Sequence, residues 1–339
     1  MEKIIEEIVI NLSLPAIFLI IAVSLYTLSK GADILVNNAV LLSEQLGIPK
    51  MIIGATIVSL GTTLPETSVS VFAAIKGNAD LALGNAVGSI ICDTALILGI
   101  ASLISPLPIK KEIVNRHGWI QLGAGILLVL ISIPYSNIGG ILTEGGHIDQ
   151  VAGFVLLVLL ALYIYISIKW TIAPKGEEAV TLSEDTAVIS KAPIFIKLAV
   201  GIAIVIVSSK ILIPAVQEAA IRMSVPNSVI AATLVAFGTS LPELVTAITA
   251  ALKGHGELAV GNIIGADILN VLFVIGSSVA VTKGGILVPP VFFKLYFPAM
   301  IFVLLLFRVG TMISKTHLKR SFGLILLASY ILVSVFSYI

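Results

Sequence analysis

Two short apolar segments of the chain carry a carboxylate directly after a break made by glycine, threonine and proline. GTTLPE ends at Glu66, and GTSLPE ends at Glu243. Proline removes a backbone donor and clashes with the carbonyl four residues earlier, so the turn before each glutamate is opened and carbonyl oxygens are freed. Carbonyl, hydroxyl and carboxylate oxygens are the ligands that hard cations such as Ca²⁺ and Na⁺ prefer. The two segments therefore predict cation sites around the freed carbonyl oxygens near Thr62 and Thr239, next to hydroxyls and a carboxylate.

A second polar pattern, GNxxG, follows each of these segments. In the first, Asn85, Ser89 and Asp93 are spaced i, i+4, i+8 and lie on one helix face. The glycines allow close approach between helix backbones. The matching residues of the second pattern are Asn262, Ala266 and Asn270.

Asp267 is a further acidic residue beside the second pattern. On an ideal helix it lies ~60° from Asn270 and ~100° from Ala266 around the axis. Two interpretations stay open for it. It borders the cation site, or it pairs with a basic or polar group elsewhere.

The two sets of motifs belong to one internal repeat. Residues 55–99 align without gaps on 232–276 at a shift of 177, with 19 identities in 45 positions. Apolar sequence matches by chance through Leu, Val and Ala, but not at Gly, Pro, Glu and Asn together. The alignment therefore predicts two structurally equivalent units.

The composition is that of a membrane protein. Of 339 residues, 58% are hydrophobic and 12% are charged, and the mean hydropathy is +1.12. A soluble domain carries about 25% charged residues, so a soluble enzyme and a disordered protein are both excluded. A net charge of +1 without a basic block makes nucleic acid an unexpected partner, and a single cysteine excludes an internal disulfide. We expect an all-α protein in the lipid bilayer, with no cofactor.

Hydropathy predicts ten transmembrane helices. They are placed near residues 13–42, 49–75, 80–104, 118–136, 149–171, 194–222, 227–252, 257–281, 287–308 and 320–338. Five spans separate equivalent points of the repeat, and five is odd, so the second copy enters the membrane from the opposite side. The predicted organisation is a first five-helix repeat over 1–171, a linker over 172–193, and a second, inverted repeat over 194–339, with the repeated motifs at 54–99 and 231–276.

The basic residues of the short connections predict the orientation. The side that holds the 172–193 linker carries 13 Lys and Arg residues, against 5 on the other side. Because basic residues favour the cytoplasm, the linker is expected to be cytoplasmic and both termini extracellular. The mid-span carboxylates then need a functional reason, because a charge at the bilayer centre costs at least ~3 kcal/mol.

At these motifs the sequence resembles the Ca²⁺:cation antiporter superfamily, in particular its prokaryotic sodium/calcium exchanger branch. GTTLPE with GNAVGSIICD is similar to the first α-repeat of that family, and GTSLPE with GNIIGADILN is similar to the second. The resemblance implies a ten-helix inverted-repeat fold in a prokaryotic-type plasma membrane. It also implies electrogenic exchange of about three Na⁺ for one Ca²⁺ by alternating access. We expect the protein to act as a monomer.

The resemblance also assigns roles to residues. Glu66 and Glu243 would bind Ca²⁺ together with the carbonyls of Thr62 and Thr239, and Asp93 and Asn270 would lie at the centre. The flanking Na⁺ sites would use the hydroxyls of Thr63, Ser240 and Ser89 and the carbonyls of Ser59 and Ala236.

Two residues depart from the family pattern. Ala266 stands where a serine is common, so one Na⁺ site loses a hydroxyl, and Asp267 next to it is a candidate replacement. The carboxylate of the central pair is on the first copy, as Asp93, with Asn270 opposite. H⁺ or K⁺ therefore remains an alternative or additional coupling ion. A channel and an intramembrane enzyme are more distant alternatives, and the chain has no HExxH or GxSxG motif.

Overall fold

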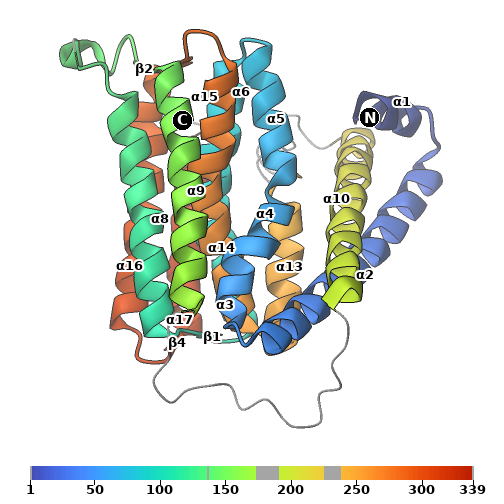
Figure 1. Cartoon of the computed structure of the whole chain (residues 1–339). Coiled ribbons are helices and arrows are strands. Elements are labelled where there is room, and N and C mark those ends of the chain that lie inside the picture. Colours follow the sequence, from blue (N-terminus) through green and yellow to red (C-terminus); the bar gives the residue numbers. More distant parts are fainter. Residues whose placement is uncertain (1, 136, 173–190, 225–237, 338–339) are drawn as a thin grey trace.

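The computed structural model of the protein describes residues 2–135, 137–172, 191–224 and 238–337 (Figure 1). Within these residues the chain is almost entirely helical. The elements of the first half are α1 (Glu2–Ile10), α2 (Leu14–Leu46), α3 (Lys50–Ile53), η1 (Gly54–Val58), α4 (Ser59–Thr62), α5 (Leu64–Ile75), α6 (Ala79–Ile91), η2 (Cys92–Ile97), α7 (Leu98–Ile104), β1 (Leu107–Pro108), α8 (Lys111–Ser132), η3 (Ile138–Gly140), β2 (Gly146–Ile148) and α9 (Gln150–Ile172).

The second half repeats this order. Its described elements are α10 (Lys191–Arg222), α13 (Leu241–Leu252), α14 (Gly256–Leu269), η5 (Asn270–Ile275), α15 (Gly276–Val281), β3 (Ile286–Val288), η6 (Phe292–Tyr296), α16 (Phe297–Ile313), β4 (His317–Leu318) and α17 (Arg320–Phe336). The segments η1, η2, η5 and η6 are π-helical, a form that occurs mostly as single turns and is frequent at functional sites. Two of them, η2 and η5, occupy matching places in the two copies of the repeat.

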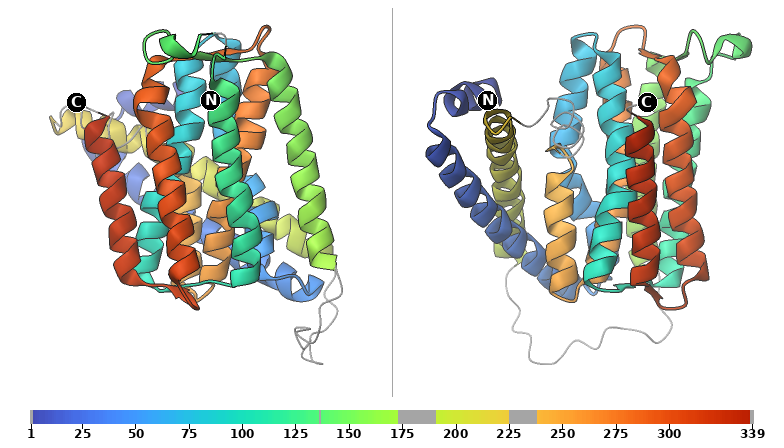
Figure 2. Two further views of the ribbon diagram at one scale, coloured as in Figure 1. Left: turned by 90° about the vertical axis from the view of Figure 1, so that its left-hand side faces the viewer. Right: turned by 180° about the vertical axis from the view of Figure 1, so that it is seen from behind.

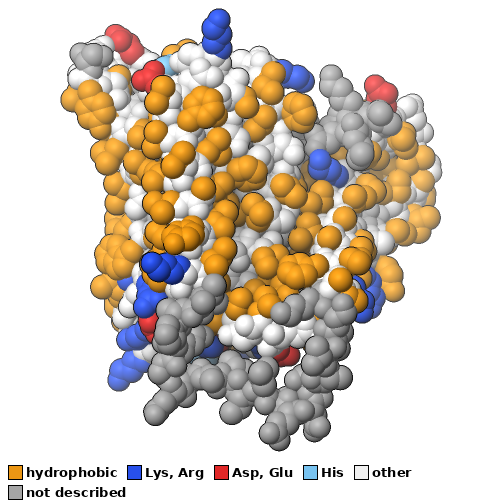
Figure 3. All heavy atoms as spheres, viewed as in Figure 1, with side chains coloured by type: hydrophobic (Ala, Val, Ile, Leu, Met, Phe, Trp, Pro, Cys, Tyr) orange, Lys and Arg blue, Asp and Glu red, His pale blue; other side chains and the backbone are white. Residues whose placement is uncertain are grey.

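Seven described helices are long and apolar enough to cross a membrane. They are Leu14–Leu46, Ala79–Ile104, Lys111–Ser132, Gln150–Trp170, Ala192–Arg222, Gly256–Val281 and Phe292–Ile313. Shorter apolar helices occupy the described parts of the other three predicted spans: Lys50–Thr62 with Leu64–Ile75, Leu241–Leu252, and Arg320–Phe336. Large apolar side chains cover the middle of the molecule, and charged side chains lie mainly toward its two ends (Figure 3). This surface is that of an integral membrane protein.

The break predicted by the proline motifs is present in the first copy. Helix α4 ends at Thr62, and α5 begins at Leu64 with Pro65 as its second residue and Glu66 in its first turn. In the second copy α13 begins in the same way, with Pro242 second and Glu243 in the first turn. Each glutamate thus lies at the positive end of a helix dipole, which favours an anion.

Two small antiparallel ribbons connect the halves of the chain. Strand β1 pairs with β4, so that Leu107 lies opposite Leu318, and β2 pairs with β3, so that Gly146 lies opposite Val288. The β1–β4 ribbon and β2 lie at opposite ends of the molecule (Figure 1). Helix α1 and the end of α17 share the end that holds β2, whereas α9 ends and α10 begins at the other (Figures 1 and 2).

Helices α2 and α10 form a separate pair beside the main body (Figures 1 and 2). Close glycine contacts hold the two together, because a Cβ on Gly31 would meet Ile204 at 2.7 Å and one on Gly201 would meet the Leu35 nitrogen at 2.8 Å. Within the body, the helical segments 79–104 and 256–281 are the most enclosed. Within an 18-residue apolar stretch of each segment, 78% and 94% of the residues are buried, against 22–44% in the other five long helices.

Glycine also decides how the broken helix approaches α14. A Cβ on Gly54 would meet the Leu258 carbonyl oxygen at 2.6 Å, and a Cβ on Gly265 would meet Ser59 Oγ at 2.6 Å. The main chain of Met51 lies equally close to Gly261. Backbone lies directly against backbone here, which is the arrangement that small residues permit between membrane helices.

We expect Gly261→Ala to destabilise the protein and to reduce transport. Its methyl group would meet the main chain of Met51, which cannot yield as a flexible side chain would, and overpacking of this kind costs ~1–3 kcal/mol. Thermal unfolding of the purified protein in detergent measures the effect. Gly123→Ala in α8 is the matched control, because a methyl group on Gly123 would meet no described atom within 4 Å. Equal unfolding temperatures for the two variants would contradict the packing argument.

Candidate cation site

The carboxylates of Glu66, Asp93 and Glu243 gather in the interior of the body. Their side chains are 1%, 1% and 0% exposed. Glu66 lies within electrostatic range of both Glu243 and Asp93, and Asp93 lies within range of Glu243. These three acidic residues of α5, η2 and α13 thus lie within electrostatic range of one another, although no three His, Cys, Asp or Glu side chains of the described residues are grouped closely enough to hold one metal ion by themselves.

None of the six oxygen atoms of these three carboxylates has a hydrogen-bond partner within the described part of the chain. No described Lys, Arg or His forms an ion pair with these three carboxylates. The ion pairs among the described residues all use other Asp and Glu side chains. Hydroxyls stand close to these carboxylates: those of Thr62 and Thr63 approach Glu243, and that of Ser240 approaches Asp93. An unpartnered buried anion is very costly, so these oxygens require positive charge from outside the protein.

A hydrogen-bond network connects the two copies of the repeat beside the carboxylates. Thr239 Oγ1 donates to Asn85 Oδ1 at 2.9 Å, and Ser240 Oγ donates to Ser89 Oγ at 3.1 Å. The Asn85 amide nitrogen donates to Ser70 Oγ at 2.9 Å and to the main-chain oxygen of Glu66 at 3.2 Å. Residues of α5, α6 and the start of α13 are therefore fixed to one another around the site.

The equivalent network on the other side is incomplete. Thr62 Oγ1 donates to Asn262 Oδ1 at a longer 3.4 Å, and the Asn262 amide nitrogen has no partner among the described residues. Thr63, the counterpart of Ser240, has no described partner for its buried hydroxyl. Two alanines explain the difference: Ala266 stands where the first copy has Ser89, the partner of Ser240, and Ala247 stands where it has Ser70, the partner of the Asn85 amide.

Two of the predicted Na⁺ ligands are main-chain carbonyls, those of Ser59 and Ala236. The Ser59 oxygen accepts a hydrogen bond from the Thr63 nitrogen at 2.9 Å and a long one from Thr62 Oγ1 at 3.4 Å. One of its two lone pairs is therefore used within the helix, and the hydroxyl of Thr62 approaches the other. Ala236 lies outside the described residues.

The central pair is Asp93 in η2 and Asn270 at the start of η5. Both side chains are buried, and both amide atoms of Asn270 lack a described hydrogen-bond partner. A neutral amide and a carboxylate thus occupy the matching positions of the two π-helical turns. Both offer oxygen atoms in the most enclosed part of the body.

Asp267 pairs with polar groups on two other elements. One of its carboxylate oxygens, Oδ2, accepts hydrogen bonds from Thr94 Oγ1 and from Gln121 Nε2, the latter at 2.6 Å. Asp267 also lies within electrostatic range of Asp93, and its other oxygen has no described partner. The predicted pairing with polar groups is therefore observed, whereas the other interpretation, that Asp267 borders the cation site, stays a prediction. Sequence reasoning missed Gln121 and Thr94, although a glutamine in the middle of the apolar α8 was a usable signal.

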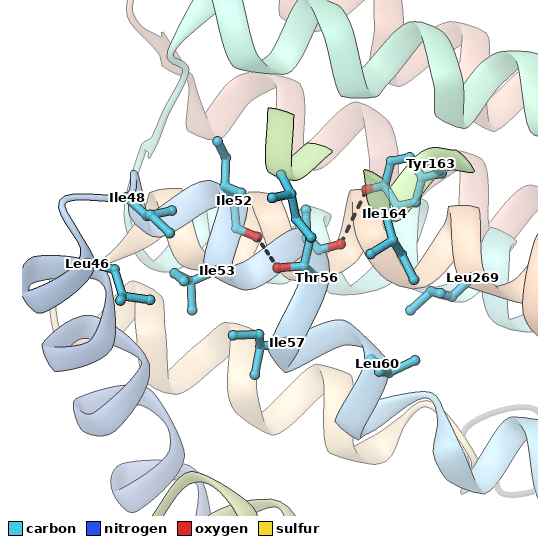
Figure 4. A pocket seen from close by; sticks show the side chains of 12 residues that line it. Leu46, Ile48, Ile52, Ile53, Thr56, Ile57, Leu60, Tyr163, Ile164 and Leu269 are labelled. Carbon is cyan, nitrogen blue, oxygen red and sulfur yellow. Dashed lines mark hydrogen bonds between the residues drawn. The ribbon is translucent and has the colours of Figure 1, made fainter. Parts of the chain in front are cut away.

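A separate cavity of about 310 Å³ lies beside the broken helix (Figure 4). Its lining is apolar apart from Thr56 and the Tyr163 hydroxyl, and it opens toward the surface at Leu60 and Ile168. Tyr163 OH donates to the carbonyl of Ala55 at 3.3 Å, which ties α9 to η1. Because no carboxylate lines this cavity, it is not the cation site.

Comparison with known proteins agrees with this arrangement. The family model described as "Sodium/calcium exchanger protein" matches residues 16–169 and 194–339. Inner membrane protein YrbG of Escherichia coli is 31% identical over 319 residues, which cover 92% of this chain and 94% of that protein. Sodium/calcium exchanger MaX1 of Methanosarcina acetivorans is 28% identical over 339 residues, which cover 93% of this chain and 96% of that protein.

A solved structure of the sodium-calcium exchanger NCX_Mj, soaked with 10 mM Na⁺ and zero Ca²⁺, has the same fold. Its TM-score is 0.79 at 25% sequence identity, over 95% of this chain and 99% of that chain. The family match extends over both halves of the chain, including both copies of the repeat. The chain is an integral membrane protein that belongs to the sodium/calcium exchanger family.

Proposed function

We propose that the protein is a secondary antiporter that exchanges Na⁺ for Ca²⁺ across the membrane by alternating access. The observation that carries the proposal is the set of three buried carboxylates, Glu66, Asp93 and Glu243, without a protein counter-charge among the described residues. Family membership agrees with it. We infer a transporter rather than an enzyme.

We further propose the architecture that the sequence predicts: ten spans in two inverted five-helix repeats, 1–171 and 194–339, joined by the 172–193 linker. The matched helix starts, with Glu66 and Glu243 each in the first turn, support two equivalent units. The ends of α1 and α17 on one side of the molecule support an even number of spans (Figure 2). We place both termini outside a prokaryotic-type plasma membrane and the linker in the cytoplasm, and we propose a monomer.

Electrostatics provides the coupling. Three buried carboxylates within electrostatic range repel one another, and each has lost its hydration. Ca²⁺ or several Na⁺ neutralise them, whereas the empty site keeps its negative charge and resists being carried across. Movement of the site then requires a bound ion in each direction, which is obligatory exchange.

In the proposed ligand set, Glu66 and Glu243 bind Ca²⁺ with the carbonyls of Thr62 and Thr239. Asp93 and Asn270 supply central oxygens. The flanking Na⁺ ligands are the hydroxyls of Thr63, Ser240 and Ser89 and the carbonyls of Ser59 and Ala236. Hydroxyl groups coordinate Na⁺ but add nothing to proton carriage, so they favour Na⁺ over H⁺ as the coupling ion.

The separate pair α2 and α10 is the proposed moving unit. Where α2 meets the body, Lys253 at the end of α13 contacts Asp33 Oδ1 at 2.8 Å and donates to Asn37 Oδ1 at 2.9 Å. These contacts are partly exposed, so breaking them is inexpensive. Sliding of the pair would open the site to one side at a time.

Replacement of either central glutamate by glutamine should abolish Ca²⁺ transport. Each variant loses a carboxylate ligand, and we expect exchange below roughly a tenth of the wild-type rate, which corresponds to at least about 1.4 kcal/mol. Uptake of ⁴⁵Ca²⁺ into proteoliposomes measures Glu66→Gln and Glu243→Gln. Glu112→Gln is the control, because Glu112 is an exposed partner of Arg116. Retained transport in both central variants would refute the site.

The coupling ion is tested by driving ⁴⁵Ca²⁺ uptake in two ways. Vesicles loaded with Na⁺ are diluted into choline, and matched vesicles receive an acid-inside gradient without Na⁺. We expect uptake to need internal Na⁺ and to rise with an inside-positive potential, because one net charge moved through 100 mV is worth ~2.3 kcal/mol. Uptake driven by the proton gradient alone would instead establish cation/proton exchange, and stimulation by K⁺ at constant Na⁺ would establish K⁺ co-transport.

Ala266→Ser should raise the apparent affinity for Na⁺. The new hydroxyl would restore the oxygen that Ser89 supplies in the first copy and would give the Thr63 hydroxyl a partner. One added hydrogen bond is worth about 0.5–1.5 kcal/mol, so the half-maximal Na⁺ concentration should fall roughly two- to tenfold. Ala280→Ser, near the end of α15, is the control. An unchanged Na⁺ dependence in a stably folded Ala266→Ser protein would contradict this account.

A further inference from the structure

Asp267 is a fourth buried carboxylate that the exchange mechanism above does not use. It is 2% exposed and lies on α14, the most enclosed helix of the body. No described Lys, Arg or His forms an ion pair with it. A fourth negative charge in the membrane interior needs a compensating cation as much as the other three do.

Hydrogen bonds hold one carboxylate oxygen of Asp267, whereas the other oxygen has no partner among the described residues. Thr94 Oγ1 and Gln121 Nε2 both donate to Oδ2, and Gln121 Nε2 also lies 3.4 Å from Thr94 Oγ1. Oδ1 has no described partner. Donors on η2 and α8 thus hold the carboxylate in one orientation while a full set of lone pairs remains available on Oδ1.

Further oxygen atoms without partners lie on the same elements. Asn270 is three residues beyond Asp267 on the same helix, and its buried amide oxygen has no described partner. Asp93 lies next to Thr94, interacts electrostatically with Asp267, and has both oxygens unpartnered. The interface between η2 and the end of α14 therefore presents oxygen ligands from Asp93, Asp267 and Asn270, with no described basic group to neutralise them.

The charge balance indicates a monovalent ion. Three Na⁺ would balance the three carboxylates of Glu66, Asp93 and Glu243. The carboxylate of Asp267 then adds one negative charge that these ions do not neutralise. Ca²⁺ needs six to eight oxygen ligands, usually with several carboxylates. Asp267 offers one free carboxylate oxygen here, and the donating amide of Gln121 on the other oxygen adds partial positive charge.

We propose that Asp267, positioned by Thr94 and Gln121, binds one additional monovalent alkali cation with Asn270 and Asp93, beside the central site. This site rests on the proposed exchange function and enlarges its cation load by one. It also assigns Asp267 a role different from replacing the hydroxyl missing at Ala266, because its fixed oxygen is turned to α8 and η2.

Two measurements on the purified full-length protein test the site. The first is the number of ²²Na⁺ or ⁸⁶Rb⁺ ions bound per chain without Ca²⁺. The second is the Hill coefficient for Na⁺, or for K⁺ at constant Na⁺, in ⁴⁵Ca²⁺ exchange. Asp267→Asn keeps the side-chain shape and removes the charge, and Asp149→Asn on the surface is the charge-matched control.

We expect Asp267→Asn to lose one bound alkali ion per chain and to lower the Hill coefficient by about one, with Ca²⁺ binding retained. Loss of a ²²Na⁺ ion identifies the ion as Na⁺, and loss of ⁸⁶Rb⁺ with loss of K⁺ stimulation identifies it as K⁺. Gln121→Leu should keep the number of ions and weaken their affinity, since Gln121 is a positioning residue. This second variant keeps the proposal testable if Asp267→Asn does not fold.

An unchanged ion count and Hill coefficient in Asp267→Asn would overturn the site, as would a change seen only when pH is varied, which would indicate a proton. Failure of the exchange function itself looks different. In that case the wild-type protein would show no Na⁺-dependent ⁴⁵Ca²⁺ exchange, while the difference of one bound alkali ion between wild type and Asp267→Asn would still be measurable.

Discussion

Negative charge without a protein counter-charge, enclosed in an apolar body, is the constraint on which the rest of the structure depends. The oxygens of Glu66, Asp93 and Glu243 are buried and unpartnered among the described residues. Proteins normally pair or hydrate such groups, because an isolated buried anion is unstable. The dipoles of the helices that begin at Leu64 and Leu241 lower this free-energy cost but do not neutralise the charge. Under the proposed function, transported cations supply the positive charge that the described protein groups lack.

The scaffold holds these charges together by backbone contact rather than by side-chain interlocking. Gly54 and Gly265 bring the broken helix against α14 so closely that even a methyl group would collide. Tyr163 holds the π-helical turn η1 through the Ala55 carbonyl. Rigid support of this kind suits a body that stays fixed while the α2–α10 pair moves, because small displacements at the site would change every ion distance at once.

The sequence predicted the break before Glu66, the polar helix face of Asn85, Ser89 and Asp93, and the membrane-embedded, mostly helical class, because proline chemistry, helical spacing and hydropathy are local signals. It did not predict that Gln121 and Thr94 would hold Asp267, since that contact joins three elements far apart in the chain. The sequence did not predict the π-helical turns either, because one added residue in a turn changes the spacing of apolar residues very little. The seven long helices match predicted spans, whereas the count of ten stays a prediction.

The differences between the two copies are as informative as their likeness. In an inverted-repeat transporter the two access states exchange the conformations of the two halves, so identical repeats would give states of equal energy. The two copies of this chain differ at the site itself: Ser240 has Ser89 as its partner, whereas the Thr63 hydroxyl has no described partner and Ala266 stands at the position that matches Ser89. The carboxylate of the central pair lies on one copy, and Asp267 lies on the other. In the proposed alternating-access cycle, each difference would favour ion binding or hydrogen bonding in one half, so the two access states would differ in energy.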